Sequence, residues 1–458
     1  YQRAGKDRDA AAVYEILVKN DPRNEEYYTK WAYYLVRAGD PQKAVEIYDR
    51  LEKLTGIHEE TTRHKHLLYM GLGDYKKAAK EIESLIAAFP KNTAYLHTLA
   101  TFYEQINDLA KAKEIYRQIL NLDPGDARAA IALAEESKGN DDQRFLTSLK
   151  PVFENPKTDI DTKIKEILPY VNRLAETGDQ SLAASLLALT GILERVHPNS
   201  AKAFSVLADV LFYSGDKEKA LAKYQKTLEL DDNIWLVWEQ VLNLLAEQKD
   251  YDQLIATAEK ALDIFPNQAT AFYFLGVGHN GEGKHKDALD ALQQALIMAS
   301  RNPRLRYDVL NETGLAYFHL KQYSQSDNAF EEALKIAGNE PLALINYSHT
   351  LAARNEKLDK AKELATHLNE LAPNVPRHEA ALAFVFYKMK DFKAAKDLLA
   401  KALAHGGEGD PAVLEQFGDV SFQLGNSAEA VQYWQRAVEK GGKSELLEKK
   451  VADGKLYE

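Results

Sequence analysis

Cysteine is absent from this chain of 458 residues. Its absence excludes disulfide bonds, thiolate metal sites and catalysis by a cysteine nucleophile, and it is compatible with an oxidising compartment. Long hydrophobic runs are absent too: the richest apolar stretch, around Leu182–Leu193, is short and contains Thr190. The sequence therefore predicts no transmembrane segment, which would need about 20 consecutive apolar residues.

An excess of positive charge is also absent. The chain has 58 Lys and Arg residues against 69 Asp and Glu residues, which gives a formal charge of -11. A protein that binds nucleic acid chiefly through its phosphates needs a dominant basic surface. The charge balance therefore argues against nucleic acid as the main partner.

What the chain does have is a repeated pattern with a spacing of 34 residues. Each copy carries Gly or Asn, then Asp, then Ala four residues later: Gly39-Asp40-Ala44, Gly73-Asp74-Ala78 and Asn107-Asp108-Ala112. A fixed period of this length is typical of a solenoid built from one repeated supersecondary unit. Each unit of a solenoid buries its apolar face on its neighbours, so the length of the chain counts repeats and not globular domains.

The stretch 25–56 shows what one unit contains. Apolar residues at helical spacing predict a first helix, and Gly39 suits its end because glycine adopts the left-handed conformation. Asp40 can cap the following helix, and Pro41 suits its first position, where an N–H would be unpaired anyway. The small Ala32 and Ala44 let the two helices approach closely.

These residues resemble the tetratricopeptide repeat, whose pattern of Trp, Leu-Gly, Tyr, Ala, aromatic, Ala and Pro occupies fixed offsets. The match continues with Tyr69, Gly73, Ala78 and Pro90, then with Leu99, Tyr103, Ala112 and Pro124. The resemblance implies an all-α protein, an α-solenoid that forms a right-handed superhelix of about a dozen helix-turn-helix repeats. Bacterial cell-envelope proteins with many such repeats look similar.

The spacing also divides the chain. We predict an N-terminal repeat array (1–138), degenerate helical repeats that form a junction (139–200), a C-terminal repeat array (201–443) and a C-terminal capping segment (444–458). The residues Pro303–Arg306 are expected to separate two repeats. Within the stretch 127–199 the pattern decays, because several prolines interrupt it.

Two motifs suggest chemistry but fail on their context. Gly276–Gly281 matches the dinucleotide-binding fingerprint, which needs a preceding strand; here it lies in a predicted helix, where glycine permits close helix contact. His64 and His66 are two residues apart and point in different directions on a helix, so a metal site with His58 is not expected. We therefore predict no cofactor, no metal and no catalytic residue.

The resemblance implies that first helices line a concave groove, with repeat positions 2, 5, 9 and 12 facing a partner. Carried over to the C-terminal half, these positions combine aromatic, amide and acidic side chains. They are Asp209, Phe212, Glu239, Asn243, Tyr273, Asn280, Asn311, Phe318, His349, Phe384, Tyr387, Glu415, Asp419 and Phe422. Amides can pair with peptide N–H and C=O groups, and aromatics give rigid apolar contact, so the set suits an extended peptide or a partner helix. Any one of these aromatics is as readily explained as a core residue.

We therefore predict a non-catalytic scaffold that binds a protein or peptide partner. Two alternatives stay open: a regulatory or substrate-recruiting part of an enzyme whose catalytic domain lies outside this sequence, and a helical-repeat RNA binder. The similarity to envelope proteins predicts a periplasmic or outer-membrane-associated location, with a lipid anchor upstream of Tyr1, or alternatively a cytoplasmic one. It points to assembly of a bacterial envelope complex. The sequence gives no oligomeric state.

Overall fold

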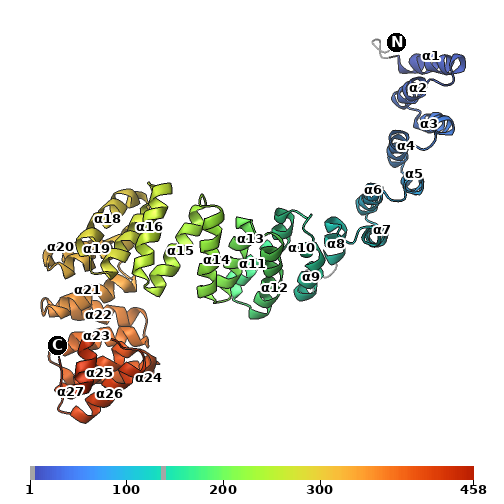
Figure 1. Cartoon of the computed structure of the whole chain (residues 1–458). Helices are drawn as coiled ribbons and strands as arrows, with labels where there is room; N and C mark the ends of the chain where they lie inside the picture. The colour runs from blue at the N-terminus through green and yellow to red at the C-terminus, as the bar shows by residue number, and fades with distance from the viewer. Residues whose placement is uncertain (1–5, 136–140, 458) are drawn as a thin grey trace. The chain divides into compact units, whose positions relative to one another are not determined.

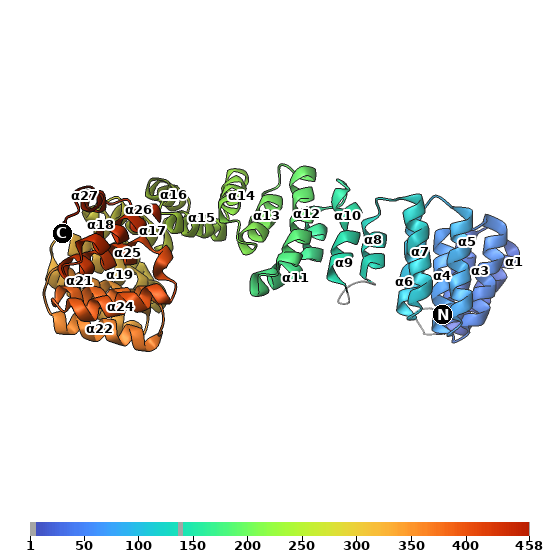
Figure 2. The same ribbon diagram turned by 90° about the horizontal axis from the view of Figure 1, so that it is seen from below.

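The computed structural model describes residues 6–135 and 141–457. Over these residues the chain consists of α-helices joined by short turns and contains no β-strand, so the predicted all-α solenoid is confirmed. The residues group into two compact units, Tyr1–Lys223 and Tyr224–Glu458. Figures 1 and 2 trace both units from the N-terminus in blue to the C-terminus in red.

Among its described residues the first unit contains thirteen α-helices, and a fourteenth crosses its boundary. They are α1 (Asp7–Asn20), α2 (Glu25–Arg37), α3 (Pro41–Thr55), α4 (Glu59–Gly71), α5 (Tyr75–Ala88), α6 (Thr93–Gln105), α7 (Leu109–Leu122), α8 (Ala127–Ala134), α9 (Asp142–Ser148), α10 (Lys150–Glu154), α11 (Ile160–Thr177), α12 (Gln180–Val196), α13 (Ala201–Tyr213) and α14 (Lys217–Leu230).

The second unit continues the alternation of first and second helices to the end of the chain. Its helices are α15 (Trp235–Gln248), α16 (Tyr251–Ile264), α17 (Ala269–Gly281), α18 (His285–Met298), η3 (Ala299–Arg301), α19 (Pro303–His319), α20 (Tyr323–Ile336), α21 (Pro341–Ala353), α22 (Leu358–Leu371), α23 (Pro376–Lys388), α24 (Phe392–Ala404), η4 (Gly407–Gly409), α25 (Pro411–Gln423), α26 (Ser427–Glu439) and α27 (Glu445–Asp453).

The turns after α2, α4 and α6 have the geometry that their residues predict. Gly39 and Gly73 have φ angles of 85° and 73°, and Asn107 takes the same left-handed conformation at 59°. The next residue caps the second helix: the carboxylate of Asp40 accepts a hydrogen bond of 3.3 Å from the backbone N–H of Lys43. Capping of this kind satisfies an N–H that the first helical turn leaves unpaired.

The glycines of Gly276–Gly281 permit close packing and lie inside α17. A Cβ atom on Gly276 would lie 2.5 Å from Cγ of Leu292, and one on Gly278 would lie 2.7 Å from Cγ1 of Ile255. No strand precedes this helix in the described residues. The prediction that these glycines serve helix contact is therefore confirmed.

One expected linker is wrong. Pro303–Arg306 does not separate two repeats, because it forms the first turn of α19, which is 17 residues long. The side chain of Asn302 caps this helix by accepting a hydrogen bond of 3.1 Å from the N–H of Leu305. Proline at the first helical position costs no hydrogen bond, so the helix simply starts one turn early.

The predicted domain limits stay predictions. The limit between residues 138 and 139 lies outside the described residues, and the limit at 200 coincides with the start of α13 at Ala201. The division into compact units falls later, between Lys223 and Tyr224. In the irregular stretch, helices α8 to α12 vary from 5 to 18 residues and share one hydrophobic core that includes Phe145, Phe153 and Leu174.

Candidate partner-binding face

Successive first helices of the second unit contact one another. Contacts join α15 to α17, α17 to α19, α19 to α21, α21 to α23 and α23 to α25. These helices therefore form a continuous surface, which we call the first-helix face; Figures 1 and 2 show this unit from yellow-green to red. Most of the predicted partner-facing residues lie on these first helices. Their exposure therefore shows which of them a partner could reach.

Most predicted residues are accessible to some degree. Asp209 and Phe212 belong to the first unit and are half-buried. In the second unit Asn243 and His349 are exposed. The half-buried residues of that unit are Glu239, Tyr273, Asn280, Phe318, Phe384, Glu415, Asp419 and Phe422. Whether these residues bind a partner stays a prediction.

Two predicted residues are buried. Asn311 is fully buried, and its Oδ1 accepts a hydrogen bond of 3.1 Å from Nδ2 of Asn346 on the adjacent α21. Tyr387 is only 9% exposed, and its ring packs 5.5 Å from that of Phe392 on the following helix. Both positions lie where neighbouring helices approach closely, so these two side chains are buried in this structure, and their contact with a partner stays a prediction.

The middle of the first-helix face brings a tyrosine, an amide and a carboxylate together. Asn280 on α17 donates hydrogen bonds of 3.1 Å to both the backbone oxygen and Oε2 of Glu312 on α19. Burial raises the pKa of Glu312 above its usual range. Burial, followed by the charges of Glu312 and Asp308, also raises the pKa of the Tyr273 phenol.

Two pairs of stacked rings lie on or beside this face, and one of them includes a ring from the second helix α18. His349 on α21 stacks on Phe384 of α23 with centroids 4.7 Å apart and an interplanar angle of 15°. His285 stacks on His319 with centroids 4.4 Å apart. Partial burial lowers the pKa of His285, and the neighbouring His319 lowers it further.

A small cavity opens between α23, α24 and α25. Its volume is about 70 Å³, and Phe384, Tyr387, Gln416 and Asp419 line it together with smaller apolar side chains. The Oε1 atom of Gln416 is buried without a hydrogen-bond partner. Three predicted residues, Phe384, Tyr387 and Asp419, therefore line the same cavity. Tyr387 is the most buried of the three.

The last three predicted residues are covered by the C-terminal helix. Lys450 of α27 is 3% exposed, and its Nζ lies 2.8 Å from Oε1 of Glu415 and 2.9 Å from the carboxylate of Asp419. Phe422 belongs to the cluster in which Leu447 of α27 is buried. The segment 444–457 therefore occupies this end of the first-helix face itself.

Sequence reasoning missed several residues of this face. Glu312, Asp308 and His319 did not enter the predicted set, although Asp308 stands at repeat position 2, which the resemblance assigns to the groove. Glu312 stands at position 6, and its inward orientation depends on the contact between α17 and α19. A search for carboxylates one helical turn apart on first helices would have found Asp308 and Glu312 together.

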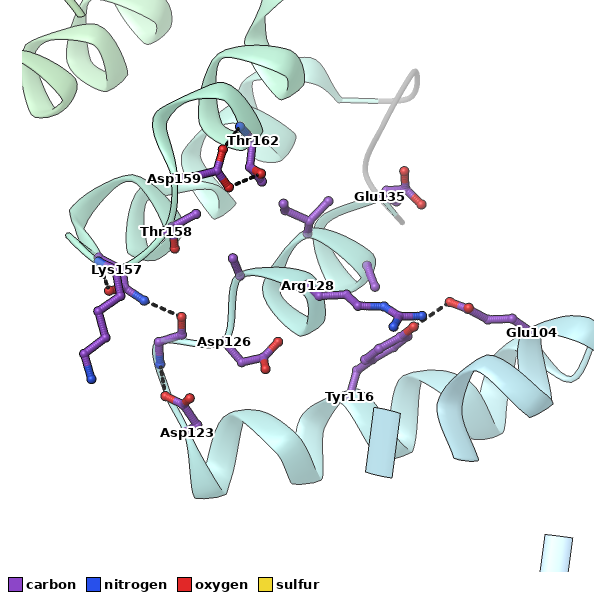
Figure 3. Close-up of a pocket in the computed structure, with 15 residues that line it drawn as sticks. Glu104, Tyr116, Asp123, Asp126, Arg128, Glu135, Lys157, Thr158, Asp159 and Thr162 are labelled. Carbon is purple, nitrogen blue, oxygen red and sulfur yellow. Dashed lines mark hydrogen bonds between the residues drawn. The ribbon is translucent and has the colours of Figure 1, made fainter. Parts of the chain in front are cut away.

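A larger cleft in the first unit competes as a candidate site. It has a volume of about 680 Å³ and is lined by α7, α8 and the start of α11. Figure 3 shows that its polar groups bond to one another and to the backbone. Asp126 caps α8 and Asp159 caps α11, each by accepting a hydrogen bond of 2.8 Å, and Tyr116 donates one of 2.7 Å to Glu104. Two of these contacts cap helices and the third joins α6 to α7, so all three are structural.

Other kinds of site find no support in the described part of the chain. Within residues 6–135 and 141–457, no three His, Asp or Glu side chains are placed to hold a metal ion. His64 stacks on Tyr48, whereas His66 faces the carbonyl oxygen of Ala78 at 3.0 Å, so the two histidines point to different neighbours. Among the same residues, every helix is too short or too polar to cross a bilayer.

Comparison with known proteins gives consistent matches to one kind of repeat. Three family models, each described as tetratricopeptide repeat, match residues 69–136, 1–56 and 307–340. Superkiller protein 3 of Schizosaccharomyces pombe is 22% identical over 72% of this chain and 26% of its own length. BBSome complex member BBS4 of Bos taurus is 20% identical over 78% of this chain and 60% of its own length.

A solved structure is also similar. The APC/C hetero-tetramer Cut9-Hcn1 has a chain that aligns with a TM-score of 0.43 at 15% identity, covering 99% of this chain and 88% of that chain. The chain spans 26% of the length of Superkiller protein 3 and 60% of the length of BBS4, which is less than two thirds of each.

Proposed function

Since the chain is a tetratricopeptide repeat protein, we propose that it is a non-catalytic scaffold that binds a protein partner on the first-helix face, as an extended peptide or a helix. One observation carries the proposal. Successive first helices contact one another and leave Tyr273, Phe318 and Phe384 half-exposed beside amide and carboxylate groups. Aromatic anchors flanked by polar groups are the usual composition of a peptide-binding surface.

We propose a protein and not a nucleic acid as the partner. The formal charge of -11 supports this choice, because binding to phosphates requires clustered Lys and Arg side chains. The first-helix face itself carries Glu239, Asp308 and Glu312. Binding to single-stranded RNA that weakens steeply with added salt would contradict the proposal.

The proposed location is the periplasm or the outer membrane of a bacterium, where the chain would take part in the assembly of an envelope complex, exported or held by a lipid anchor. The absence of cysteine supports an oxidising compartment without requiring one. Fractionation of the native cell followed by immunoblotting tests the proposal. Recovery of the protein with cytoplasmic markers would contradict it.

Partner binding is tested in two steps. Crosslinking and mass spectrometry in the native cell identify the partner and the crosslinked residues. Binding of the purified partner is then compared for the wild type, for Phe318→Ala with Phe384→Ala, and for Ile297→Ala, which removes a 64% exposed side chain from the second helix α18. We expect the double variant to bind at least about tenfold more weakly and the control to bind normally.

The outcome depends on folding, so circular dichroism and thermal melting accompany the binding measurements. Loss of binding with an unchanged melting curve supports the proposal. Equal binding by the double variant, or crosslinks confined to second helices, would place the partner elsewhere. Tyr387 is left unchanged in this test because it is buried and its removal would affect packing.

A further inference from the structure

We propose that the middle of the first-helix face takes a basic side chain, Lys or Arg, from the partner segment, with Glu312 as its carboxylate. This inference rests on the proposed function, because it specifies the chemistry of the segment that the face binds. It is argued from the charges on α17 and α19, from the tyrosine beside them, and from an equivalent contact that the chain makes with its own C-terminal helix.

Glu312 is a half-buried carboxylate without a cation. Its described contacts are with Asn280, whose Nδ2 lies 3.1 Å from Oε2. Among the described residues no Lys, Arg or His nitrogen lies within 4.0 Å of it, although the structure contains many such pairs elsewhere. A carboxylate that is shielded from water and bonded only to an amide is stabilised by an incoming positive charge.

The neighbouring acid shows the difference that a cation makes. Asp308, one turn before Glu312 on α19, lies 3.3 Å from Nε of Arg304. Arg304 is 64% exposed and also reaches Glu340 at 3.1 Å. One exposed guanidinium thus serves two carboxylates and leaves Glu312 without a cation, so the local charge balance of this surface is negative.

Tyr273 gives the same place an aromatic wall. It lies on α17 and packs against the apolar cluster that contains Val309 of α19, the helix that carries Glu312. Its hydroxyl makes no hydrogen bond within the described part of the chain. A tyrosine ring next to a carboxylate is a favourable surface for a Lys or Arg side chain, since the ring attracts the cation and covers its methylene groups.

The C-terminal helix α27 shows a segment of this chemistry bound by the same kind of surface. Its Lys450 reaches the carboxylates of Glu415 and Asp419, which stand four residues apart on the first helix α25, as Asp308 and Glu312 do on α19. The ammonium also lies 6.0 Å from the ring of Trp434. A helix with a lysine between apolar residues is therefore an occupant that first helices of this chain accommodate.

The test uses a phage-displayed library of random 12-residue peptides, selected against the full chain. Peptides are retained for analysis when Phe318→Ala with Phe384→Ala abolishes their binding, which places them on the first-helix face. We expect the retained peptides to be enriched in Lys or Arg. A synthetic peptide from this set and its analogue with norleucine in place of the lysine are then measured by calorimetry.

We expect Glu312→Gln to weaken the lysine peptide by about tenfold and to leave the norleucine peptide unchanged, because only the first loses a charged partner. Glu259→Gln, which removes an exposed carboxylate from the second helix α16, is the matched control and should leave both peptides unaffected. Arg304→Gln should strengthen binding of the lysine peptide, since it removes the guanidinium that pairs with Asp308 and Glu340 and leaves this surface more negative.

Two results overturn the inference in different ways. Retained peptides without basic residues, or equal affinities for wild type and Glu312→Gln, would refute the basic side chain and leave the proposed binding face intact. Selection that yields no peptide dependent on Phe318 and Phe384 would refute the proposed function, and this inference with it. Circular dichroism of each variant shows that the fold is retained.

Discussion

Lys450 and Asp419 form an ion pair of 2.9 Å that joins the C-terminal helix α27 to the first helix α25. Lys450 is 3% exposed and also reaches Glu415 at 2.8 Å, while the indole N–H of Trp434 donates a hydrogen bond of 2.8 Å to Oδ1 of Asp419. One ammonium therefore faces two carboxylates. Burial lowers the pKa of Lys450, but the two acids more than offset it, so the pKa is raised.

We expect Lys450→Met to lower the free energy of unfolding by about 3 kcal/mol, because it leaves the partly buried carboxylates of Glu415 and Asp419 without a cation. Hydrogen exchange of residues 445–453 should quicken more than exchange elsewhere in the second unit. The control is Lys449→Met, whose ion pair with Glu445 is exposed and should change stability by less than about 0.5 kcal/mol. Equal effects of the two variants would show that the buried ion pair does not stabilise the docking of α27.

Asp419 predicts a pH dependence of the same contact. Burial raises its pKa from 3.8 to about 6, against the opposing effect of Lys450. A carboxyl group whose pKa is higher in the folded state favours folding when it is protonated, so its contribution is fully present below pH 3.8 and is lost as the pH rises through about 6. The difference in free energy of unfolding between wild type and Asp419→Asn should therefore vary between pH 4 and pH 6.

The Asp419→Asn comparison is made by denaturant unfolding at several pH values. Its asparagine retains an oxygen that can accept the Trp434 bond, so the difference isolates the titration. The free energy of unfolding of wild type, relative to the variant, should fall by roughly 2–3 kcal/mol from pH 4 to pH 6. A constant difference across this range would mean that Asp419 titrates normally.

Lys163 predicts a dependence of the opposite kind in the irregular stretch of the first unit. It is fully buried, and its Nζ bonds to the carbonyl oxygens of Phe153 at 3.0 Å and Asn155 at 2.7 Å and to Nε2 of His197 at 2.8 Å. Burial lowers its pKa to about 8. The folded state therefore disfavours the ammonium, and this cost is relieved as the pH rises from about 8 towards 10.5.

We expect the stability of wild type relative to Lys163→Met to increase between pH 8 and pH 10.5. Thermal unfolding at matched ionic strength measures it. The control is Lys165→Met, an exposed lysine on the same helix α11, for which the difference should stay constant with pH. A constant difference for Lys163→Met as well would indicate that water reaches its ammonium group.

Much of the fold follows from the sequence, because the repeat is specified locally. The first helices α2, α4 and α6 begin at Glu25, Glu59 and Thr93, at the spacing of 34 residues that the repeat predicts. The early start of α19 was also written in the sequence, as Asn302 followed by Pro303, but the spacing of 34 concealed it. Local capping chemistry therefore deserves precedence over the period where the two disagree.

The candidate site was predictable only in part. The repeat positions identify which residues lie near the first-helix face, but the approach of α21 decides that Asn311 is buried. The docking of α27 likewise decides that Asp419 already has a cation. Both outcomes depend on contacts between residues distant in sequence, which the pattern of a single repeat does not contain.

Replacing a glycine inside a helix by alanine should have opposite effects on stability at two positions. Gly276→Ala should destabilise the second unit by roughly 1–3 kcal/mol, because the added Cβ would lie 2.5 Å from Cγ of Leu292. Gly191→Ala, within α12, meets no atom within 4 Å and should stabilise the first unit by up to about 1 kcal/mol, since alanine favours the helix. Thermal unfolding of both variants checks this. Stabilisation by Gly276→Ala would mean that α17 and α18 can separate without cost.

The turns of three repeats carry a lysine where other repeats carry glycine. Lys249, Lys321 and Lys390 have φ angles of 57°, 60° and 64°. A side chain in this left-handed conformation costs about 1–2 kcal/mol, because its Cβ crowds the following carbonyl oxygen. All three side chains are exposed, so their removal sacrifices little packing.

We expect each of Lys249→Gly, Lys321→Gly and Lys390→Gly to raise the free energy of unfolding by about 0.5–1 kcal/mol, after the greater backbone entropy of unfolded glycine is subtracted. The sites lie in different turns, so the triple variant should show roughly the sum. The control is Lys440→Gly, at a helix end where φ is -86° and no strain is relieved. Denaturant unfolding measures all four; if Lys440→Gly stabilised the chain as much as the others, loss of charge and not backbone strain would be the cause.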